Sequence, residues 1–162
     1  MNPLPPLRHN GADFTPILIV DTREQCPLIF TRLPSEPGTL ATGDYSTRGL
    51  TDKFAIERKS IEDLTGCVAG ERERFERELA RMDGLRFKRL LIVGSRDAIA
   101  AHDYHSKVSP ASVMGSLYSW EQRFGVPFLF EPDPEKAAAI VELWAYYAVR
   151  DVFRTEERVV GK

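Results

Sequence analysis

Short apolar runs separated by polar turns predict a series of buried strands along the chain. The runs 17–20 and 90–93 are wholly apolar and have the length of strands covered on both faces. The strand-breaking residues from Pro34 to Gly38 predict a loop between two such segments. Apolar stretches of similar length predict further strands at 28–30, 44–50, 54–59 and 126–130.

Helical spacing of apolar residues predicts four helices between these strands. Ser60, with Asp63 three residues later, has the pattern of a capping box at a helix start. Phe75, Leu79 and Met82 fall on one face of a second helix. The four predicted helices begin at Ser60 and span 71–82, 111–124 and 134–153.

Strands that alternate with helices after an early strand cluster are typical of an α/β fold. We therefore expect one domain over residues 17–162, built on a central mixed sheet flanked by helices. Residues 1–16 contain four of the eleven prolines and no apolar run. This composition predicts a poorly ordered, proline-rich N-terminal arm.

The composition excludes several classes of protein. Hydrophobic residues make up 43% of the 162 residues, which excludes a wholly disordered chain. No stretch approaches the roughly 20 apolar residues that a membrane span needs, and the N-terminus has no signal-peptide core. Cys26 and Cys67 are too few for a disulfide framework. We expect a protein of the cytoplasm, in a prokaryotic or phage-infected cell, or of the nucleus, and not a secreted one.

The net charge of -2 excludes a polycation that grips nucleic acid by bulk charge. Any chemistry on nucleic acid must therefore come from a local site. Acidic and basic residues concentrate at the predicted strand ends in the first half of the chain.

The segment 54–59 carries the strongest chemical pattern. In a strand, Glu57 and Lys59 share one face, while Arg58 lies on the other. A hairpin with the preceding strand brings Asp44 beside Glu57. Two converging carboxylates are suited to Mg²⁺ or Mn²⁺, and a nearby ammonium can orient a water molecule or offset charge on a phosphate. The alternative is a surface ion pair between Glu57 and Lys59, worth about 0–1 kcal/mol.

The wider pattern distinguishes these alternatives. Gly43-Asp44, then twelve residues, then Glu57-Arg58-Lys59, then three residues and Asp63, resembles the signature of the XPF-type structure-specific endonucleases. These enzymes belong to the PD-(D/E)xK nuclease superfamily. The family's Asp-x-Arg-Glu element is matched by residues 21–24, after the first strand. The resemblance covers residues 17–153 and implies a restriction-endonuclease-like core.

The resemblance implies roles for individual residues. Asp44, Glu57 and Lys59 would form the catalytic core. The additional acids of the site would be Asp21, which we include among the metal ligands, Glu24 and Asp63. Arg23 and Arg58 would lie near the phosphates, and we include Arg58 among the catalytic residues.

Each supporting residue has a structural alternative. Arg23 and Arg58 have guanidinium groups suited to bidentate phosphate contact, but they equally suit salt bridges that hold the acids together. Asp63 suits a helix cap, with or without a catalytic role. Asp21 and Glu24 suit a turn and a solvated acid.

Basic residues are frequent in the helix 71–82. We predict that Arg72, Arg74 and Arg77 bind DNA phosphates. The alternative is a solvated helix with ion pairs between residues four apart, which we favour for Arg81.

Other candidate side chains carry weaker signals. His102 and His105 lack an evident third metal ligand and are more typical of a surface. Cys67 suits a small core residue. We favour core or interface roles over base stacking for the aromatic residues Trp120, Trp144, Tyr146 and Tyr147.

We therefore expect a Mg²⁺- or Mn²⁺-dependent DNA endonuclease, with branched or flap DNA as the substrate that the resemblance implies. Such a unit suits DNA repair, recombination or phage DNA processing. The chain has no room for the helix-hairpin-helix modules that many family members carry, which predicts a homodimer or a separate DNA-binding partner. The alternative is an inactive nuclease-fold scaffold that binds DNA and pairs with an active partner.

Overall fold

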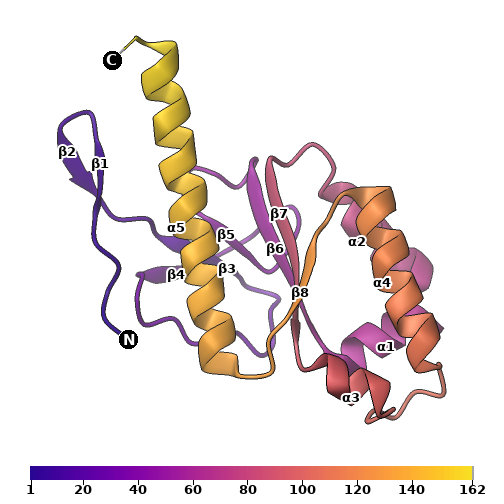
Figure 1. The fold of residues 1–162 in the computed structure, drawn as a ribbon. Helices are drawn as coiled ribbons and strands as arrows, with labels where there is room; N and C mark the ends of the chain where they lie inside the picture. Colours follow the sequence, from indigo (N-terminus) through magenta and orange to yellow (C-terminus); the bar gives the residue numbers. More distant parts are fainter. Residues whose placement is uncertain (162) are drawn as a thin grey trace.

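A six-stranded mixed sheet, seen in a computed structural model that describes residues 1–161, forms the centre of the molecule (Figure 1). The strand order is β4-β3-β5-β6-β7-β8. Strand β3 is parallel to β4 and antiparallel to β5, β5 is antiparallel to β6, and β6, β7 and β8 run parallel. These strands are β3 (Leu18–Asp21), β4 (Ser35–Gly38), β5 (Tyr45–Thr47), β6 (Phe54–Ser60), β7 (Phe87–Val93) and β8 (Phe128–Phe130). The expected α/β fold with a central mixed sheet is confirmed.

Helices cover both faces of the sheet. The long helix α5 crosses one face, and α1, α2 and α4 gather on the other (Figure 1). The five helices are α1 (Ile61–Ala69), α2 (Arg72–Arg81), α3 (Arg96–Ala100), α4 (Pro110–Phe124) and α5 (Pro134–Val159). No helix in the described part of the chain is both long and apolar enough to cross a membrane.

Strand β6 separates two hydrophobic cores. Its side chains alternate: Phe54 and Ile56 pack in the core beneath α5, and Ala55 packs in the core beneath α1, α2 and α4. This alternation follows the two-residue period of a strand. The residues after Ile56 keep the same alternation, so the end of β6 presents different chemistry to each side.

Two helix predictions rest on local signals that the structure contains. Ser60 caps α1 in a complete capping box with Asp63. Helix α4 ends at Gly125, whose φ of 62° is left-handed and favours glycine. Helix α5 continues six residues beyond the predicted end at 153, and α3 was not predicted because five residues give too short a pattern.

The segment from 28 to 38 differs from the prediction. Residues 28–30 form no strand, and the predicted loop 34–38 contains the edge strand β4. Leu28 still lies in the core, and its backbone N–H donates to the Tyr45 hydroxyl at 3.0 Å. Pro37 fits strand β4 because an edge strand tolerates a residue without a backbone N–H.

The N-terminal arm is also more ordered than the prediction. Strands β1 (Leu7–His9) and β2 (Ala12–Phe14) form an antiparallel hairpin. The turn is Asn10-Gly11, and both residues have positive φ angles, of 50° and 81°. Asn-Gly favours such two-residue turns, so the sequence contained a hairpin signal that the proline content obscured. His9 and Phe14 contact Phe153 of α5, which anchors the hairpin.

Candidate active site

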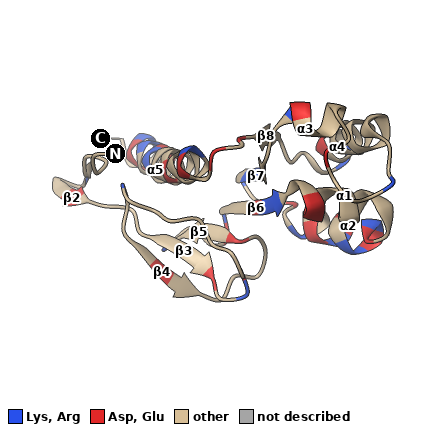
Figure 2. Cartoon of the chain, turned by 90° about the horizontal axis from the view of Figure 1, so that it is seen from below, with Lys and Arg blue, Asp and Glu red and all other residues tan. Residues whose placement is uncertain are grey.

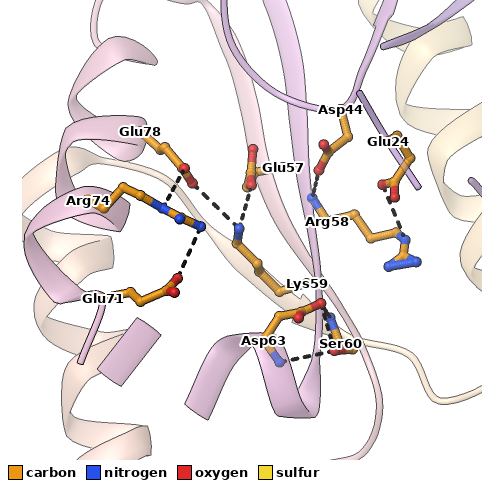
Figure 3. Close-up of polar contacts among 10 residues, drawn as sticks. All are labelled: Glu24, Asp44, Glu57, Arg58, Lys59, Ser60, Asp63, Glu71, Arg74 and Glu78. Atoms are coloured by element: carbon orange, nitrogen blue, oxygen red, sulfur yellow. Dashed lines mark hydrogen bonds and ion pairs between the residues drawn. The ribbon is translucent and has the colours of Figure 1, made fainter. Parts of the chain in front are cut away.

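The pairing of β5 with β6 brings Asp44 and Glu57 together. Tyr45 faces Ile56 in the antiparallel register, so the neighbouring residues Asp44 and Glu57 lie across from each other. The Asp44 backbone N–H donates to the Ile56 carbonyl at 2.8 Å, which fixes the register at this point. The predicted hairpin therefore juxtaposes two acids separated by twelve residues of sequence (Figure 3).

Gly43 makes this close approach of the two strands possible. Its φ of 77° is left-handed. A Cβ atom at this position would lie 3.0 Å from the Ile56 carbonyl oxygen and 3.1 Å from the Ala55 Cβ. Any larger side chain would therefore push Asp44 away from β6.

Lys59 lies between two carboxylates on the α2 side of β6. Its Nζ is 2.9 Å from Glu57 Oε1 and 3.5 Å from Glu78 Oε2 (Figure 3). Glu78 also lies 3.8 Å from Arg74 Nε, so the chain of charges continues along α2. The Phe75 ring, 5.0 Å from the ammonium, closes one side of this environment.

These side chains line one polar cleft of about 360 Å³ between the sheet and α2. The loop 41–44 and strand β3 form one wall, and β6 and α2 form the other. The charged residues that line it are Asp21, Arg23, Asp44, Glu57, Lys59, Arg74, Glu78 and Arg81.

Burial and mutual repulsion make the two facing carboxylates poor anions. Desolvation raises the pKa of Asp44 to about 6, against a hydrogen bond at 2.7 Å from the Arg58 backbone N–H. Desolvation, together with the Asp44 charge, raises the pKa of Glu57 to about 7, although Lys59 opposes this shift. Burial acts to lower the pKa of Lys59, but the ion pair with Glu57 outweighs it and raises that pKa.

The carboxylate pair fits a divalent cation. Among residues 1–161, Asp44 receives a hydrogen bond on Oδ2 only, and Glu57 contacts Lys59 through Oε1 only. One oxygen of each acid thus remains without a protein donor in the described chain. Two desolvated carboxylates with open oxygens suit a hard ion such as Mg²⁺ or Mn²⁺. No cluster of three or more potential His, Cys, Asp or Glu ligands occurs within 1–161, so water or phosphate oxygens would complete the coordination.

Asp21 lines the cleft but is already saturated with donors. Its Oδ1 accepts from the Arg23 backbone N–H at 2.9 Å and from Arg23 Nε at 2.8 Å. Its Oδ2 accepts from Arg23 Nη2 and from the Leu40 backbone N–H, both at 2.8 Å. The Arg23 hydrogen bonds hold the pKa of Asp21 well below its usual range. Asp21 therefore positions Arg23 and the start of the 40–44 loop, and the predicted metal role has no free oxygen here.

Glu24 and Arg58 lie on the opposite face of the sheet edge. Arg58 Nε is 3.6 Å from Glu24 Oε2, and its Nη2 donates to the Cys26 carbonyl at 2.7 Å. The Arg58 side chain thus points away from Glu57, and only its backbone contacts Asp44 (Figure 3). The structure favours the salt-bridge alternative over the predicted catalytic role for this guanidinium.

Asp63 also lies outside the cleft. Its Oδ2 accepts from the Ser60 hydroxyl at 2.8 Å, and its backbone N–H donates to that hydroxyl at 3.1 Å. Asp63 is thereby engaged as the acid of the α1 cap.

The arginines of α2 divide between two surfaces. Arg74 lines the cleft, but Arg72 donates to the Ser116 hydroxyl of α4 and lies over the Trp120 ring. Arg77 is exposed and does not line the cleft. Arg81, which we favoured as a solvated residue, does line it. Basic and acidic residues alternate on α2, so the helix as a whole is no basic face (Figure 2).

Glu78 was missing from the sequence predictions. It follows Arg74 by four residues and precedes Arg81 by three, so helical spacing already places the three on one face. Only the packing of Phe75 and Leu79 into the core turns that face toward β6.

The weaker candidates have structural roles. His105 Nδ1 pairs with Glu62 at 2.9 Å on the surface. Cys67 is buried, as predicted, and desolvation raises its thiol pKa to about 11. Trp120 is a core residue, as predicted. Trp144 and Tyr147 differ, because both remain accessible beside α5.

Comparison with known proteins agrees with this geometry. Residues 20–143 match the ERCC4 domain model. Solved structures of XPF from Aeropyrum pernix match with a TM-score of 0.67 at 19% identity, and in complex with DNA with a TM-score of 0.65 at 19% identity. The alignments cover 82% and 84% of this chain, but only 61% and 66% of the archaeal chains. The chain therefore has an XPF-like nuclease fold. No curated protein matches it.

Proposed function

The chain belongs to the ERCC4 domain family, and from this premise we propose that it is a divalent-metal-dependent DNA endonuclease of the XPF type. The observation that carries the proposal is the cleft in which Asp44, Glu57 and Lys59 converge. Metal dependence is typical of this nuclease family, and the two desolvated carboxylates are the ligands such an ion prefers.

Asp44 and Glu57 would hold Mg²⁺ or Mn²⁺. When bound, such an ion supplies Lewis-acid chemistry, because it polarises a phosphoryl oxygen and lowers the pKa of water. It also lowers the pKa of both acids, since it replaces their mutual repulsion with attraction.

Lys59 positions the attacking water and stabilises charge on the phosphate. The ion pair with Glu57 keeps its ammonium protonated, so Lys59 acts as a donor and not as a base. A protonated donor fixed in a desolvated cleft stabilises the negative charge that develops as water attacks phosphorus in line with the leaving oxygen.

Arg23, Arg74 and Arg81 rim the cleft and are placed to contact the phosphates on either side of the cut. Arg23 and Arg74 have side chains that are 68% and 63% exposed, so both can reach a DNA backbone. The neutral overall charge limits affinity to such local contacts. Branched or flap DNA remains the proposed substrate, and repair, recombination or phage DNA processing the proposed setting.

The remaining 34–39% of the archaeal chains that the alignments do not cover implies that junction recognition needs further protein. We propose a homodimer or a separate DNA-binding partner for that role. The rival function, an inactive scaffold, is disfavoured because the acids and the lysine are all present in one cleft.

Nicking of a splayed-arm DNA by the purified chain, with MgCl₂, MnCl₂ or EDTA, tests the proposal. We expect cleavage with either metal and none with EDTA. Asp44→Asn and Lys59→Met should each reduce the rate by roughly 100-fold or more. Glu73→Gln, on the exposed side of α2, is the matched control and should retain activity.

Equal activity of the wild type, Asp44→Asn and Lys59→Met would mark a contaminant and favour the scaffold. Parallel assays on linear, flap and four-way DNA and on RNA of the same sequence would define the substrate.

A further inference from the structure

A second pocket lies on the face of the sheet opposite the catalytic cleft. It has a volume of about 290 Å³ and is formed by α5 and the first halves of β6 and β7. We call it the α5 pocket and define it by Phe87, Arg89, Trp144, Tyr147, Arg150 and Arg154. It shares no residue with the cleft.

The α5 pocket combines aromatic surface with uncompensated positive charge. Phe54 is buried at its base, whereas Tyr147 is 46% exposed at its edge. Arg150 lies 4.3 Å above the Tyr147 ring and Arg89 lies 5.7 Å from the Trp144 ring. Stacked arginines of this kind extend the flat surface on which a planar ring can lie.

The charges of the pocket favour an anion. Asp151 is its one acidic lining residue, and Asp151 is already paired with Arg86. Among residues 1–161, no carboxylate lies within 4.0 Å of Arg89, Arg150 or Arg154. In a chain with a net charge of -2, three such arginines around one pocket form a local positive site.

The position of the pocket relates it to the cleft. On β7, Phe87 pairs with Phe54 and Arg89 pairs with Ile56, one residue before Glu57. The same two strands thus carry the cleft on one face and the α5 pocket on the other. The turn 82–86 joins Arg81, at the rim of the cleft, to the start of β7.

We propose that the α5 pocket binds an unpaired DNA strand, with a base against Trp144 and Tyr147 and phosphates on Arg150 and Arg154. Aromatic rings together with arginines are the combination that proteins use for single strands, since every base has a stacking face and every linkage a charge. A strand that leaves the cleft past Arg81 reaches this pocket around the turn 82–86. The proposal rests on the proposed function only in taking DNA as the nucleic acid.

Fluorescence anisotropy of a labelled oligothymidylate of about 12 nucleotides, a length typical of single-strand sites, tests the proposal without catalysis. The full chain with Asp44→Asn is used in EDTA, so the loss of nicking activity cannot affect the result. The double variant Arg150→Gln/Arg154→Gln should weaken binding about tenfold and lower the slope of log affinity against log salt by about 1. The double variant Lys107→Gln/Lys136→Gln, which removes the same charge from exposed positions elsewhere, should bind as the parent does.

Two further measurements test base stacking separately from charge. Tyr147→Ala should weaken oligothymidylate binding about fivefold, but should leave binding of an abasic strand of equal length unchanged. Oligothymidylate should also quench the fluorescence of Trp144, which is accessible, and Trp144→Phe should abolish that quenching, because Trp120 is fully buried.

Equal losses in the two double variants would overturn the proposal, since the binding would then depend on total charge alone. Equal binding of abasic and normal strands would overturn the base-stacking part. Concentration-dependent dimerisation that Tyr147→Ala abolishes would assign the pocket to a second copy of the chain, and preferential binding of polyglutamate would assign it to an acidic peptide. Failure of the nicking assay with intact strand binding would overturn the proposed function alone.

Discussion

The Lys59 ammonium lies 2.9 Å from Glu57 and 3.5 Å from Glu78, and so bridges β6 and α2. Glu57 and Lys59 form a pair that the strand period predicts, whereas Glu78 comes from a helix nineteen residues later. The second carboxylate restricts the ammonium to one position at the edge of the cleft. Glu78 is therefore a positioning residue for Lys59.

Replacement of Glu78 by glutamine should keep the fold and reduce the nicking rate about fivefold, the effect of one partly exposed charged contact. The loss should lie in the maximal rate and not in DNA affinity. Rate and affinity of Glu78→Gln and of the exposed control Glu73→Gln are measured by single-turnover nicking and anisotropy. Unchanged kinetics in Glu78→Gln would show that Glu57 alone positions Lys59.

Gly43 should tolerate no side chain. Gly43→Ala adds both a left-handed alanine and a contact at 3.0 Å with the Ile56 carbonyl, and we expect a loss of about 2–3 kcal/mol in the free energy of unfolding. Gly49 has a similar φ of 83° but open space around it, so Gly49→Ala should cost about 1 kcal/mol. Urea denaturation of both variants measures the difference. Equal losses would show that conformation, and not the approach of the strands, selects glycine at 43.

The stability of the metal-free protein should fall as the pH rises. In the unfolded chain, Asp and Glu titrate near pH 4, but in the folded protein the pKa values of Asp44 and Glu57 are raised to about 6 and about 7. Between about pH 4 and pH 7 the folded state therefore binds more protons, and the free energy of unfolding should decrease by roughly 1–3 kcal/mol.

Urea denaturation in EDTA across this pH range measures the effect. The variant Asp44→Asn/Glu57→Gln should have a flatter profile, and Mn²⁺ should restore the stability of the wild type above pH 7. A wild-type profile that rises with pH would contradict the raised pKa values.

Asp63 should contribute to stability and not to chemistry. Because it completes the capping box of α1, Asp63→Ala should lower the free energy of unfolding by about 1 kcal/mol. Its nicking rate under conditions where the variant is folded should remain within about threefold of the wild type. A loss as large as that of Asp44→Asn would assign Asp63 to the reaction instead.

Glu142 of α5 should be the most costly buried acid to replace. Its Oε1 accepts the backbone N–H groups of Thr31, Arg32 and Leu33 at 2.9, 2.6 and 2.9 Å. Glu142→Leu leaves these donors without a partner, and we expect a loss of at least about 3 kcal/mol in the free energy of unfolding. Glu142→Gln keeps an acceptor oxygen and should lose less. Thermal and urea denaturation compare the two variants, and equal losses would contradict the role of the shared acceptor.

Several features of this protein follow from the sequence alone. Local spacing determines the alternation along β6, the cap at Ser60 and the helix end at Gly125, because each depends on neighbours within a few residues. The strand period separates Glu57 and Lys59 from Arg58, and the short link between β5 and β6 brings Asp44 opposite Glu57. The metal-binding pair and its lysine were therefore predictable together with the α/β fold.

Only the tertiary structure decided which other charges share the cleft. Asp21 and Arg58 satisfied the same motif as Asp44, but hydrogen bonds from Arg23 and Leu40 occupy one, and the opposite face of β6 holds the other. Arg81 and Glu78 enter the cleft, and Arg72 leaves it, because the packing of Phe75 and Leu79 sets the rotation of α2. Sequence spacing fixes which residues share a face, but long-range packing fixes what that face meets.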